Sequence, residues 1–343
     1  MSARPWLDRE TRFIAARGQP ACLIDLALSR DIDSHRILKG TGLFYDDLLS
    51  NEPYISAQQF HRLIDNSKQL LAADDSAFLF GQQLLPGHYG PTSNVLLHAD
   101  TLLQALQYLQ RFKALLSPLC APVMRMDEQM LYLYWLDSFE SGQNRQFLLE
   151  ASMAAVTALT RQLAGPNLPW HYHLEYAEPS YIEQYWVHLG EHLRFQSPAS
   201  FMCLPREHLA GRVRQASAVV GQIAEQQSRQ QQEQLAGEES MTDRLFDYLC
   251  EYMPRLAGLE QVAGDFGMST ATFKRRLQRE GTHFQAQLDR ARTLIAVDLY
   301  LCRGFSNEAV ASYLRFNDRT NFRRFLKRLT GRSPNDLRQW LGS

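Results

Sequence analysis

The chain has 343 residues, of which 45% are hydrophobic and 21% charged, a composition typical of a folded protein of about two domains. Its apolar stretches are interrupted by polar residues well before the ~18 residues of a membrane-spanning helix, and its N-terminus lacks the apolar core of a secretory signal, so we expect neither membrane insertion nor export. Residues 242–343 carry a net charge of +6 and the preceding 241 residues carry −7, which suggests an anionic partner for the basic part. Five well-separated cysteines without a Cys-x-x-Cys pair indicate free thiols in a reducing compartment, so the cytoplasm is the expected location.

The N-terminal two-thirds of the chain mixes helical and strand-like patterns. Ser56-Ala57-Gln58-Gln59 is a capping box that predicts the start of a helix, and residues 101–116 and 147–163 have the apolar spacing of two further helices. Residues 130–136 and 171–176 are rich in aromatic side chains and predict strands. We therefore expect an α/β domain.

The two predicted strands and their surroundings carry aromatic side chains with polar tips. Such side chains could wall a pocket for a small molecule, or they could simply belong to the core. The candidate pocket residues are Tyr132, Tyr134, Trp135, Trp170, Tyr172 and Tyr176. His171 and His173 would share one face of the second strand, but no third ligand stands at a suitable spacing, so we expect no metal site and no cofactor.

Glutamine dominates a short segment that follows. Seven of the thirteen residues 222–234 are Gln, and because such a run cannot supply a buried face, residues 226–241 are predicted to be a solvated helix end or a linker. This segment separates a domain of residues 1–225 from a domain of residues 242–343. The helical pattern just before it has a 3-4-3 apolar spacing, which suits either the pairing of two copies or packing at a domain edge. Its apolar residues are Val213, Ala216, Val220 and Ile223.

The C-terminal part is almost entirely helical in pattern. A short apolar helix from Leu259 stops at Gly267, a residue suited to a left-handed turn, and Ser269 can cap the next helix. In that helix Phe273 and Leu277 face inward. The opposite face, at positions i, i+3, i+4 and i+7, consists of Ala271, Lys274, Arg275 and Gln278. A short helix, a turn and a helix with one buried and one basic face predict a helix-turn-helix.

The same arrangement returns about forty-five residues later. Ser306 can cap a short helix, and a turn of residues 315–318 leads into a longer one. This longer helix is expected to bury Phe322, Phe325, Leu326 and Leu329. Its outer face, again at i, i+3, i+4 and i+7, consists of Thr320, Arg323, Arg324 and Lys327. Residues 284–302 predict one rigid helix of about 28 Å between the units, which would suit two recognition helices in successive major grooves of DNA.

Many residues of this part stand in a characteristic order. The first unit contains Val262-Ala263, Gly267-Met268-Ser269, Phe273, Arg275, Leu277 and Gly281-Thr282-His283-Phe284. The second contains Val310-Ala311, Leu314, Phe316, Asp318, Phe322, Arg324, Lys327-Arg328, Gly331-Arg332-Ser333-Pro334 and Leu337-Arg338. Through them residues 242–341 resemble the DNA-binding domain of the AraC/XylS family of bacterial regulators. By position, the resemblance implies base-edge contacts from Ala271, Lys274, Arg275, Arg319, Thr320 and Arg324, of which Arg319 follows from the resemblance alone.

The donor geometry of the basic side chains separates two kinds of contact. Arg275 and Arg324 can each offer a fork of N–H donors to guanine O6 and N7 in the major groove. Lys274, Arg323 and Lys327 suit phosphates better.

Three residues depart from the family pattern. Arg315 stands where Gly is usual in the second turn, so this turn either carries the strain of a positive φ or has altered geometry, with phosphate contact as another use of the side chain. Arg276 replaces an apolar residue, which affects the packing of the first recognition helix. Phe325 replaces a small residue and is expected to fill added core.

The N-terminal part contains Gly87-His88-Tyr89-Gly90, followed by Thr101-Leu102-Leu103-Gln104-Ala105-Leu106. With these motifs, residues of about 20–210 resemble the ligand-binding domain of AraC-family regulators related to the ornithine-utilisation regulator. The resemblance implies an effector-sensing role and does not identify the effector. The first motif is not a phosphate loop, because it lacks the Lys and the strand-loop-helix setting.

The combined layout indicates a sequence-specific transcription regulator modulated by a small-molecule effector of unknown identity. Two alternatives stay open: control by a protein partner that docks on the N-terminal domain, and a DNA-directed enzyme that carries the same DNA-binding module. The second lacks support, since no local Cys–His or Ser-elbow signature indicates a nucleophile. The expected partners are double-stranded DNA, the effector, RNA polymerase and a second copy of the chain.

Overall fold

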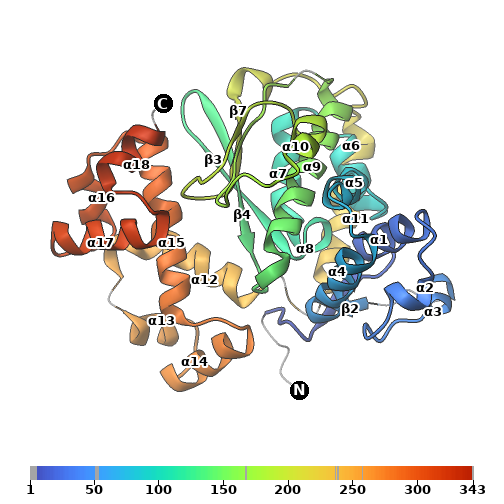
Figure 1. Ribbon diagram of the computed structural model, residues 1–343, viewed down its shortest axis with the longest axis horizontal. Helices are drawn as coiled ribbons and strands as arrows, with labels where there is room; N and C mark the ends of the chain where they lie inside the picture. Colours follow the sequence, from blue (N-terminus) through green and yellow to red (C-terminus); the bar gives the residue numbers. More distant parts are fainter. Residues whose placement is uncertain are drawn as a thin grey trace.

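The computed structural model describes residues 6–50, 54–166, 168–235, 237, 239–256 and 258–341. In Figure 1 the C-terminal helices, in orange and red, lie on one side of a central sheet, and most N-terminal helices lie on the other side. The expected class is confirmed: a mixed α/β domain precedes an all-helical domain with two helix-turn-helix units joined by a long helix.

The central sheet has five strands in the order β3-β4-β7-β5-β6. Neighbouring strands are antiparallel except β5 and β6, which are parallel. The strands are β3 Cys120–Met126, β4 Met130–Asp137, β5 His171–His173, β6 Leu193–Arg194 and β7 Phe201–Pro205. A separate antiparallel pair consists of β1 Arg12–Ala15 and β2 Tyr54–Ser56.

Strand β4 is buried on both faces, which explains its continuous apolar sequence. Leu131 and Leu133 belong to the core beneath the N-terminal helices. Tyr132 and Tyr134 point to the opposite face and belong to a second core, which continues into the C-terminal helices. The sheet is therefore a wall shared by both domains.

The N-terminal helices form the layer on the far side of the sheet from the C-terminal domain (Figure 1). They are α1 Gln19–Leu28, α2 Ser34–Ile37, α3 Tyr45–Ser50, α4 Ala57–Leu71, α5 Ser76–Leu84, α6 Pro91–Leu97, α7 Leu102–Arg111, α8 Lys113–Leu116, α9 Arg145–Ala164 and α10 Ile182–His188. The predicted capping box is present, with Ser56 Oγ accepting from the Gln59 N–H at 3.2 Å and Gln59 Oε1 accepting from the Ser56 N–H at 3.0 Å.

Two elements differ from their predicted extents. The helix expected over residues 101–116 is divided into α7 and α8 at Phe112, whose φ of −98° and ψ of +29° are not helical. The strand expected over residues 171–176 ends at His173. Beyond it the chain still makes main-chain hydrogen bonds, from the Leu174 N–H to the Arg194 carbonyl at 2.8 Å and from the Gln196 N–H to the Tyr176 carbonyl at 2.9 Å, but the regular strand pairing has ended.

The glutamine-rich segment is largely a helix, α11 Ala218–Glu233, which packs against α6. Only Ala224 and Ser228 of this helix are buried, and most of its glutamines are exposed. The predicted segment 226–241 thus begins as a solvated helix end; its residues 236 and 238 lie outside the described residues. The division of the chain at this segment stays a prediction.

The C-terminal domain consists of seven helices among the described residues, all packed around one apolar core. They are α12 Met241–Tyr252, α13 Leu259–Asp265, α14 Thr270–Arg279, α15 Phe284–Leu301, α16 Asn307–Tyr313, α17 Arg319–Thr330 and α18 Pro334–Leu341. Across the described parts of the chain, no helix has the length and apolar character needed to cross a membrane.

Candidate nucleic-acid interface and ligand cavity

The first helix-turn-helix consists of α13 and α14. Its turn is made by Gly267, whose φ is +67°, a conformation that residues with a side chain rarely adopt. Ser269 caps α14 by accepting a hydrogen bond from the Thr272 N–H at 3.2 Å. Because Phe273 and Leu277 are fully buried, α14 presents its opposite side to solvent. The predicted contact residues on that side, all exposed, are Ala271, Lys274, Arg275 and Gln278.

The second helix-turn-helix consists of α16 and α17. Arg315 adopts a φ of +64° in the turn, so the position keeps the left-handed geometry without glycine. Its guanidinium donates to the carbonyl of Pro254 at 3.3 Å. Asp318 caps α17 by accepting from the Asn321 N–H at 2.8 Å. The predicted contact residues of α17, all exposed, are Arg319, Thr320, Arg323, Arg324 and Lys327.

The buried side of α17 is narrower than predicted. Phe322, Phe325 and Leu326 are buried, and Phe325 packs on Phe316 with ring centroids 4.9 Å apart, so it fills core as expected. The predicted burial of Leu329 is wrong, because this side chain is 39% exposed at the edge of a cleft between α17 and the sheet.

The long helix α15 holds the two recognition helices, α14 and α17, in a fixed relation. Its 18 residues correspond to about 27 Å. Ala291 and Leu299 are buried in the domain core, and Arg328 of α17 donates to Asp289 of α15 at 2.6 Å. The spacer is therefore continuous and bonded to the second unit.

The polar residue at position 276 is accommodated by a segment far away in the sequence. The Arg276 guanidinium lies 5.5 Å from the centre of the Trp6 ring, and Trp6 also packs on Phe266 at 5.7 Å. The N-terminal segment thus covers the place that an apolar side chain would fill. Nothing in the local sequence pattern indicated a role for Trp6.

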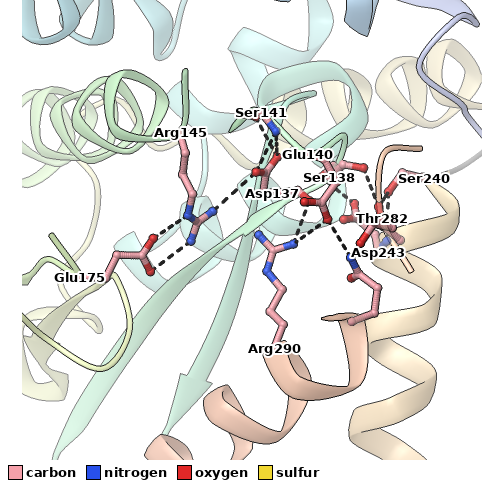
Figure 2. Close-up of polar contacts among 12 residues, drawn as sticks. Asp137, Ser138, Glu140, Ser141, Arg145, Glu175, Ser240, Asp243, Thr282 and Arg290 are labelled. Carbon is pink, nitrogen blue, oxygen red and sulfur yellow. Dashed lines mark hydrogen bonds and ion pairs between the residues drawn. The ribbon is translucent and has the colours of Figure 1, made fainter. Parts of the chain in front are cut away.

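A polar network joins the C-terminal domain to the end of β4 (Figure 2). Gln287 donates to Glu140 at 2.7 Å, and Ser138 donates to Asp243 of α12 at 3.1 Å. The Lys113 ammonium lies 3.4 Å from the Asp243 carboxylate. Burial alone would lower the pKa of Lys113, but the nearby carboxylates of Asp243 and Glu239 have the larger effect, so its pKa is raised.

A cleft of about 580 Å³ lies beside this network. Arg145 and Glu175, which form an ion pair with each other, lie on its wall.

The six aromatic residues predicted as a pocket do not surround a common cavity in the described structure. Tyr132 and Tyr134 lie in the core shared with the C-terminal domain, whereas Trp135, Trp170 and Tyr172 lie in the N-terminal core. Tyr172 bonds to Thr157 at 2.7 Å, and Trp170 donates to Thr160 at 3.0 Å. Tyr176 bonds to Tyr185 at 3.0 Å. A strand buried on both faces carries apolar side chains on both, and many of these are aromatic here, which is why the pattern resembled the wall of a pocket.

A cavity of about 540 Å³ opens instead on the other side of the N-terminal domain, next to α11. Its volume is within the range of small-molecule sites. Its walls come from the β1–α1 turn, β2, the Gly87-His88-Tyr89-Gly90 motif, α8 and the glutamine-rich helix. The lining residues are Phe13, Ile14, Ala15, Arg17, Gly18, Gln19, Tyr54, His88, Tyr89, Gly90, Pro91, Ala114, Leu115, Pro118, Gln227, Gln230, Gln231 and Gln234.

The described residues contain no group of three or more His, Cys, Asp or Glu side chains placed to hold a metal ion. All five cysteines are free thiols. His173, one of the two histidines considered for a metal, stacks on Phe201 with ring centroids 4.1 Å apart and has Trp340 of α18 at 5.7 Å. Its role is in the contact between the domains.

Two helix-turn-helix units with basic outer faces, packed on a domain that contains an open cavity, define a DNA-binding regulator. Comparison with known families agrees: residues 32–213 match the arabinose-binding domain of AraC transcription regulators, and residues 262–339 match a helix-turn-helix domain. Since the first match covers more than half of the chain, the chain belongs to the AraC family. It is a DNA-binding transcription regulator with an N-terminal effector-binding domain, in a family that is not enzymatic.

Three individual proteins are similar to this chain. The chain is 24% identical over 318 residues to the ornithine utilization regulator of Pseudomonas aeruginosa. The aligned region covers 92% of this chain and 94% of that protein. It is 37% identical over 75 residues, 22% of each chain, to an uncharacterized HTH-type transcriptional regulator of Mycobacterium tuberculosis. The crystal structure of the transcriptional regulator CdpR from Pseudomonas aeruginosa aligns with 19% identity and a TM-score of 0.44, over 94% of this chain and 98% of that one.

Proposed function

We propose that this protein controls transcription by placing α14 and α17 in successive major grooves, and that an effector in the 540 Å³ cavity alters how they are presented. The observation that carries the proposal is the cavity wall. Gln227, Gln230 and Gln234 belong to α11 or its end, the last long element before the DNA-binding domain. A ligand in the cavity would touch the segment that leads into α12.

The contacts with DNA follow from donor geometry and exposure. Arg275 and Arg324 are exposed on the outer faces of the recognition helices and would read guanine by bidentate hydrogen bonds. Lys274, Arg323 and Lys327 would bind phosphates. Arg319 lies 3.4 Å from the exposed Glu308 and would exchange this ion pair for a contact with DNA.

The remaining contact residues have smaller side chains. Ala271 would meet a thymine methyl group, while Thr320 and Gln278 would bond base edges or phosphates.

Two protein partners are also proposed. The first is RNA polymerase, whose access to a promoter a DNA-bound transcription regulator would control. A second copy could pair through α11, where Val219 and Ile223 are 69% and 53% exposed. Val213, part of the predicted seam, is buried in the N-terminal core and would not take part. Analytical ultracentrifugation of the wild type and of Ile223→Glu tests the pairing, which the variant should abolish.

The experiment that tests the regulator proposal is selection of genomic DNA fragments by the purified protein, followed by footprinting. Each copy should protect two major-groove segments about one helical turn apart on one face of the DNA. Five base pairs inserted between the segments rotate them by about half a turn and should abolish high-affinity binding. Full affinity for such an insert would contradict simultaneous binding by two rigidly joined helices. The double variant Arg275→Ala, Arg324→Ala is the control: it should fold normally and should no longer bind the selected DNA site with high affinity.

A further inference from the structure

The basic surface of the second recognition helix continues past the end of that helix. Asp336 lies in the first turn of α18, where hydrogen bonds from Ser333 lower its pKa and the guanidinium groups of Arg323 and Arg332 lower it further. Arg323 stands on the outer face of α17, and Arg332 belongs to the turn that follows this helix. Basic side chains therefore lead from the outer face of α17 toward α18.

A single aromatic ring carries this basic surface onto the N-terminal domain. The Arg332 guanidinium lies 5.0 Å from the centre of the Trp340 ring in α18, and the guanidinium of Arg194, in β6, lies 5.7 Å from the same centre. Arg194 donates to the main-chain carbonyl of Trp340 at 3.4 Å, and Arg332 donates to that of Gln196 at 3.3 Å. Each domain thus places an arginine on the other, and two like charges lie beside one ring.

These two arginines keep their positive charge unpaired. Neither Arg194 nor Arg332 forms an ion pair with a carboxylate in the described parts of the chain. Arg194 is exposed and Arg332 is half-buried. Because a guanidinium has five N–H donors, each side chain keeps donors beyond its bond to a carbonyl. Unpaired charges of one sign at a surface suit an anionic partner.

Two histidines extend the cluster along the edge of the sheet. The exposed rings of His171, in β5, and His192 stack with their centroids 4.6 Å apart. Burial lowers the pKa of His171, and His192 and Arg194 lower it further, so bases surround this ring. Glu191, which precedes His192 and is exposed, offsets one of these charges. Residues 1–241 carry a net charge of −7, so average composition does not explain a basic cluster at this border.

We propose that Arg194 and Arg332 bind phosphates of the DNA that flanks the base pairs read by α17, an inference that rests on the proposed function because it places α17 in a major groove. The N-terminal domain thereby extends the DNA interface of the second unit. Double-stranded DNA carries one negative charge per about 1.7 Å of its axis, so a basic surface continuous with a bound helix meets further phosphates. These contacts add affinity for a flank of any sequence.

Duplexes that differ only in the length of one flank test the proposal on the full-length protein. Both contain the selected site, and the flank beyond the half-site of α17 measures either about fifteen base pairs, one and a half helical turns, or about three. The half-site of α17 is the one whose base preference changes in Arg324→Ala. Fluorescence anisotropy gives the dissociation constants between about 50 and 200 mM salt.

The wild type should bind the longer duplex about tenfold more tightly at low salt. The slope of log K against log salt concentration should be steeper by about 1.8, since each phosphate contact contributes about 0.9. The same extension beyond the half-site of α14 is the control and should add little. Equal affinity for long and short duplexes, or a gain only from the control extension, would overturn the proposal.

Variants assign the gain to the basic cluster. Arg194→Met keeps an unbranched side chain against Trp340 and removes the charge. It should weaken binding to the longer duplex about three- to fivefold, reduce the salt slope by about 0.9 and leave the short duplex unchanged. Arg194→Lys keeps the charge and should retain most of the gain. Arg36→Ala removes an exposed charge from α2, at the opposite end of the molecule from α18 (Figure 1), and should retain all of it.

Two results for Arg194→Met would contradict the proposal. Equal weakening of both duplexes would show that Arg194 acts through the contact between the domains. Unchanged binding of both duplexes would show that the cluster serves another partner, such as an acidic segment of a protein. The Arg275→Ala, Arg324→Ala variant should lose the selected site with either flank, so failure of the flank effect leaves the proposed function standing.

Discussion

Arg290, near the middle of α15, donates a hydrogen bond to the main-chain carbonyl of Asp137 at the end of β4, with an N···O distance of 3.2 Å. The same guanidinium lies 3.7 Å from Glu140 (Figure 2). The helix that joins the two DNA-binding units is therefore bonded directly to the sheet of the effector-binding domain. Any displacement of the sheet relative to the recognition helices must break or rearrange these contacts.

Arg290→Ala should lower the free energy of unfolding by about 1–2 kcal/mol, because it removes a charge-assisted hydrogen bond and leaves the Asp137 carbonyl without that donor. Urea denaturation of the full chain measures the change. Arg255→Ala, at an exposed position of the same domain, is the matched control and should alter stability by less than about 0.5 kcal/mol. Equal effects of the two substitutions would show that the contact does not hold the domains together.

Arg324→Ala should cost about 1–3 kcal/mol of binding free energy on the selected DNA site and should relax the preference at one base pair. Lys327→Ala, three residues further along α17, should weaken all sequences alike, since a phosphate contact carries no sequence information. Gel-shift titrations against a set of site variants measure both. If Arg324→Ala leaves the relative affinities of these variants unchanged, its assignment as a base-reading residue is wrong.

Gly267 and Arg315 occupy corresponding turns, with φ of +67° and +64°. Gly267→Ala should destabilise the protein by about 1 kcal/mol through backbone strain alone, because a Cβ there meets no atom within 4 Å. Arg315→Gly relieves the same strain and loses the bond to Pro254, so its net effect should be smaller than that of Gly267→Ala. Thermal unfolding of the two variants provides the comparison, and a larger loss for Arg315→Gly would mean that the Pro254 contact outweighs the strain.

Burial, together with the nearby Asp8 carboxylate, raises the pKa of Glu280 to about 7 from its ordinary value of 4.5. The folded state thus holds a proton that the unfolded state releases earlier, so this group favours folding at low pH and its contribution is lost as the pH rises from about 4.5 to about 7. Glu280→Gln should keep the neutral form at every pH. The variant should therefore gain stability over the wild type toward pH 8, by at most about 3 kcal/mol.

Urea denaturation between pH 5 and pH 8 yields this difference. Glu10→Gln, a carboxylate that is 70% exposed, is the control and should show no such trend. A wild-type minus variant difference that stays constant with pH would contradict the raised pKa.

The DNA-binding part could be predicted because its determinants are local in sequence. Ser269, Ser306 and Gly267 mark helix ends within a few residues, and the buried and exposed faces of α14 and α17 follow from helical spacing. Leu329 was misplaced, since a residue at the margin of an apolar stripe is buried only when a neighbour covers it, and spacing does not reveal the neighbour.

The cavity could not be predicted in the same way. Its walls bring residues 13–19 together with residues 88–91 and 227–234, and no local pattern connects these segments. The sequence pattern assigns the glutamines of α11 to a solvated helix end. They line the cavity only because α11 packs on α6. The aromatic side chains of the predicted strands suggested a pocket that the structure does not form. The C-terminal domain covers the sheet face of Tyr132 and Tyr134, which would otherwise be exposed.

Tyr134 tests whether the sheet and the C-terminal helices share one core. Its side chain is 3% exposed on the sheet face toward α12 and α15, beside Phe246 and Ile295. Tyr134→Ala should lower stability by about 3–5 kcal/mol, as expected for an aromatic side chain truncated in a core. Because the core belongs to both domains, the loss should appear equally in the hydrogen-exchange protection of α12 and of β4.

Tyr134→Phe separates the packing of this side chain from its polar atom. The Tyr134 hydroxyl is buried without a hydrogen-bond partner in the described structure, so its removal should leave stability unchanged or raise it. The packing account requires that the Ala variant destabilise both domains and that the Phe variant destabilise neither. If Tyr134→Ala weakens protection in β4 alone, the two domains unfold independently, and an effector signal would have to pass through α11 rather than across the sheet.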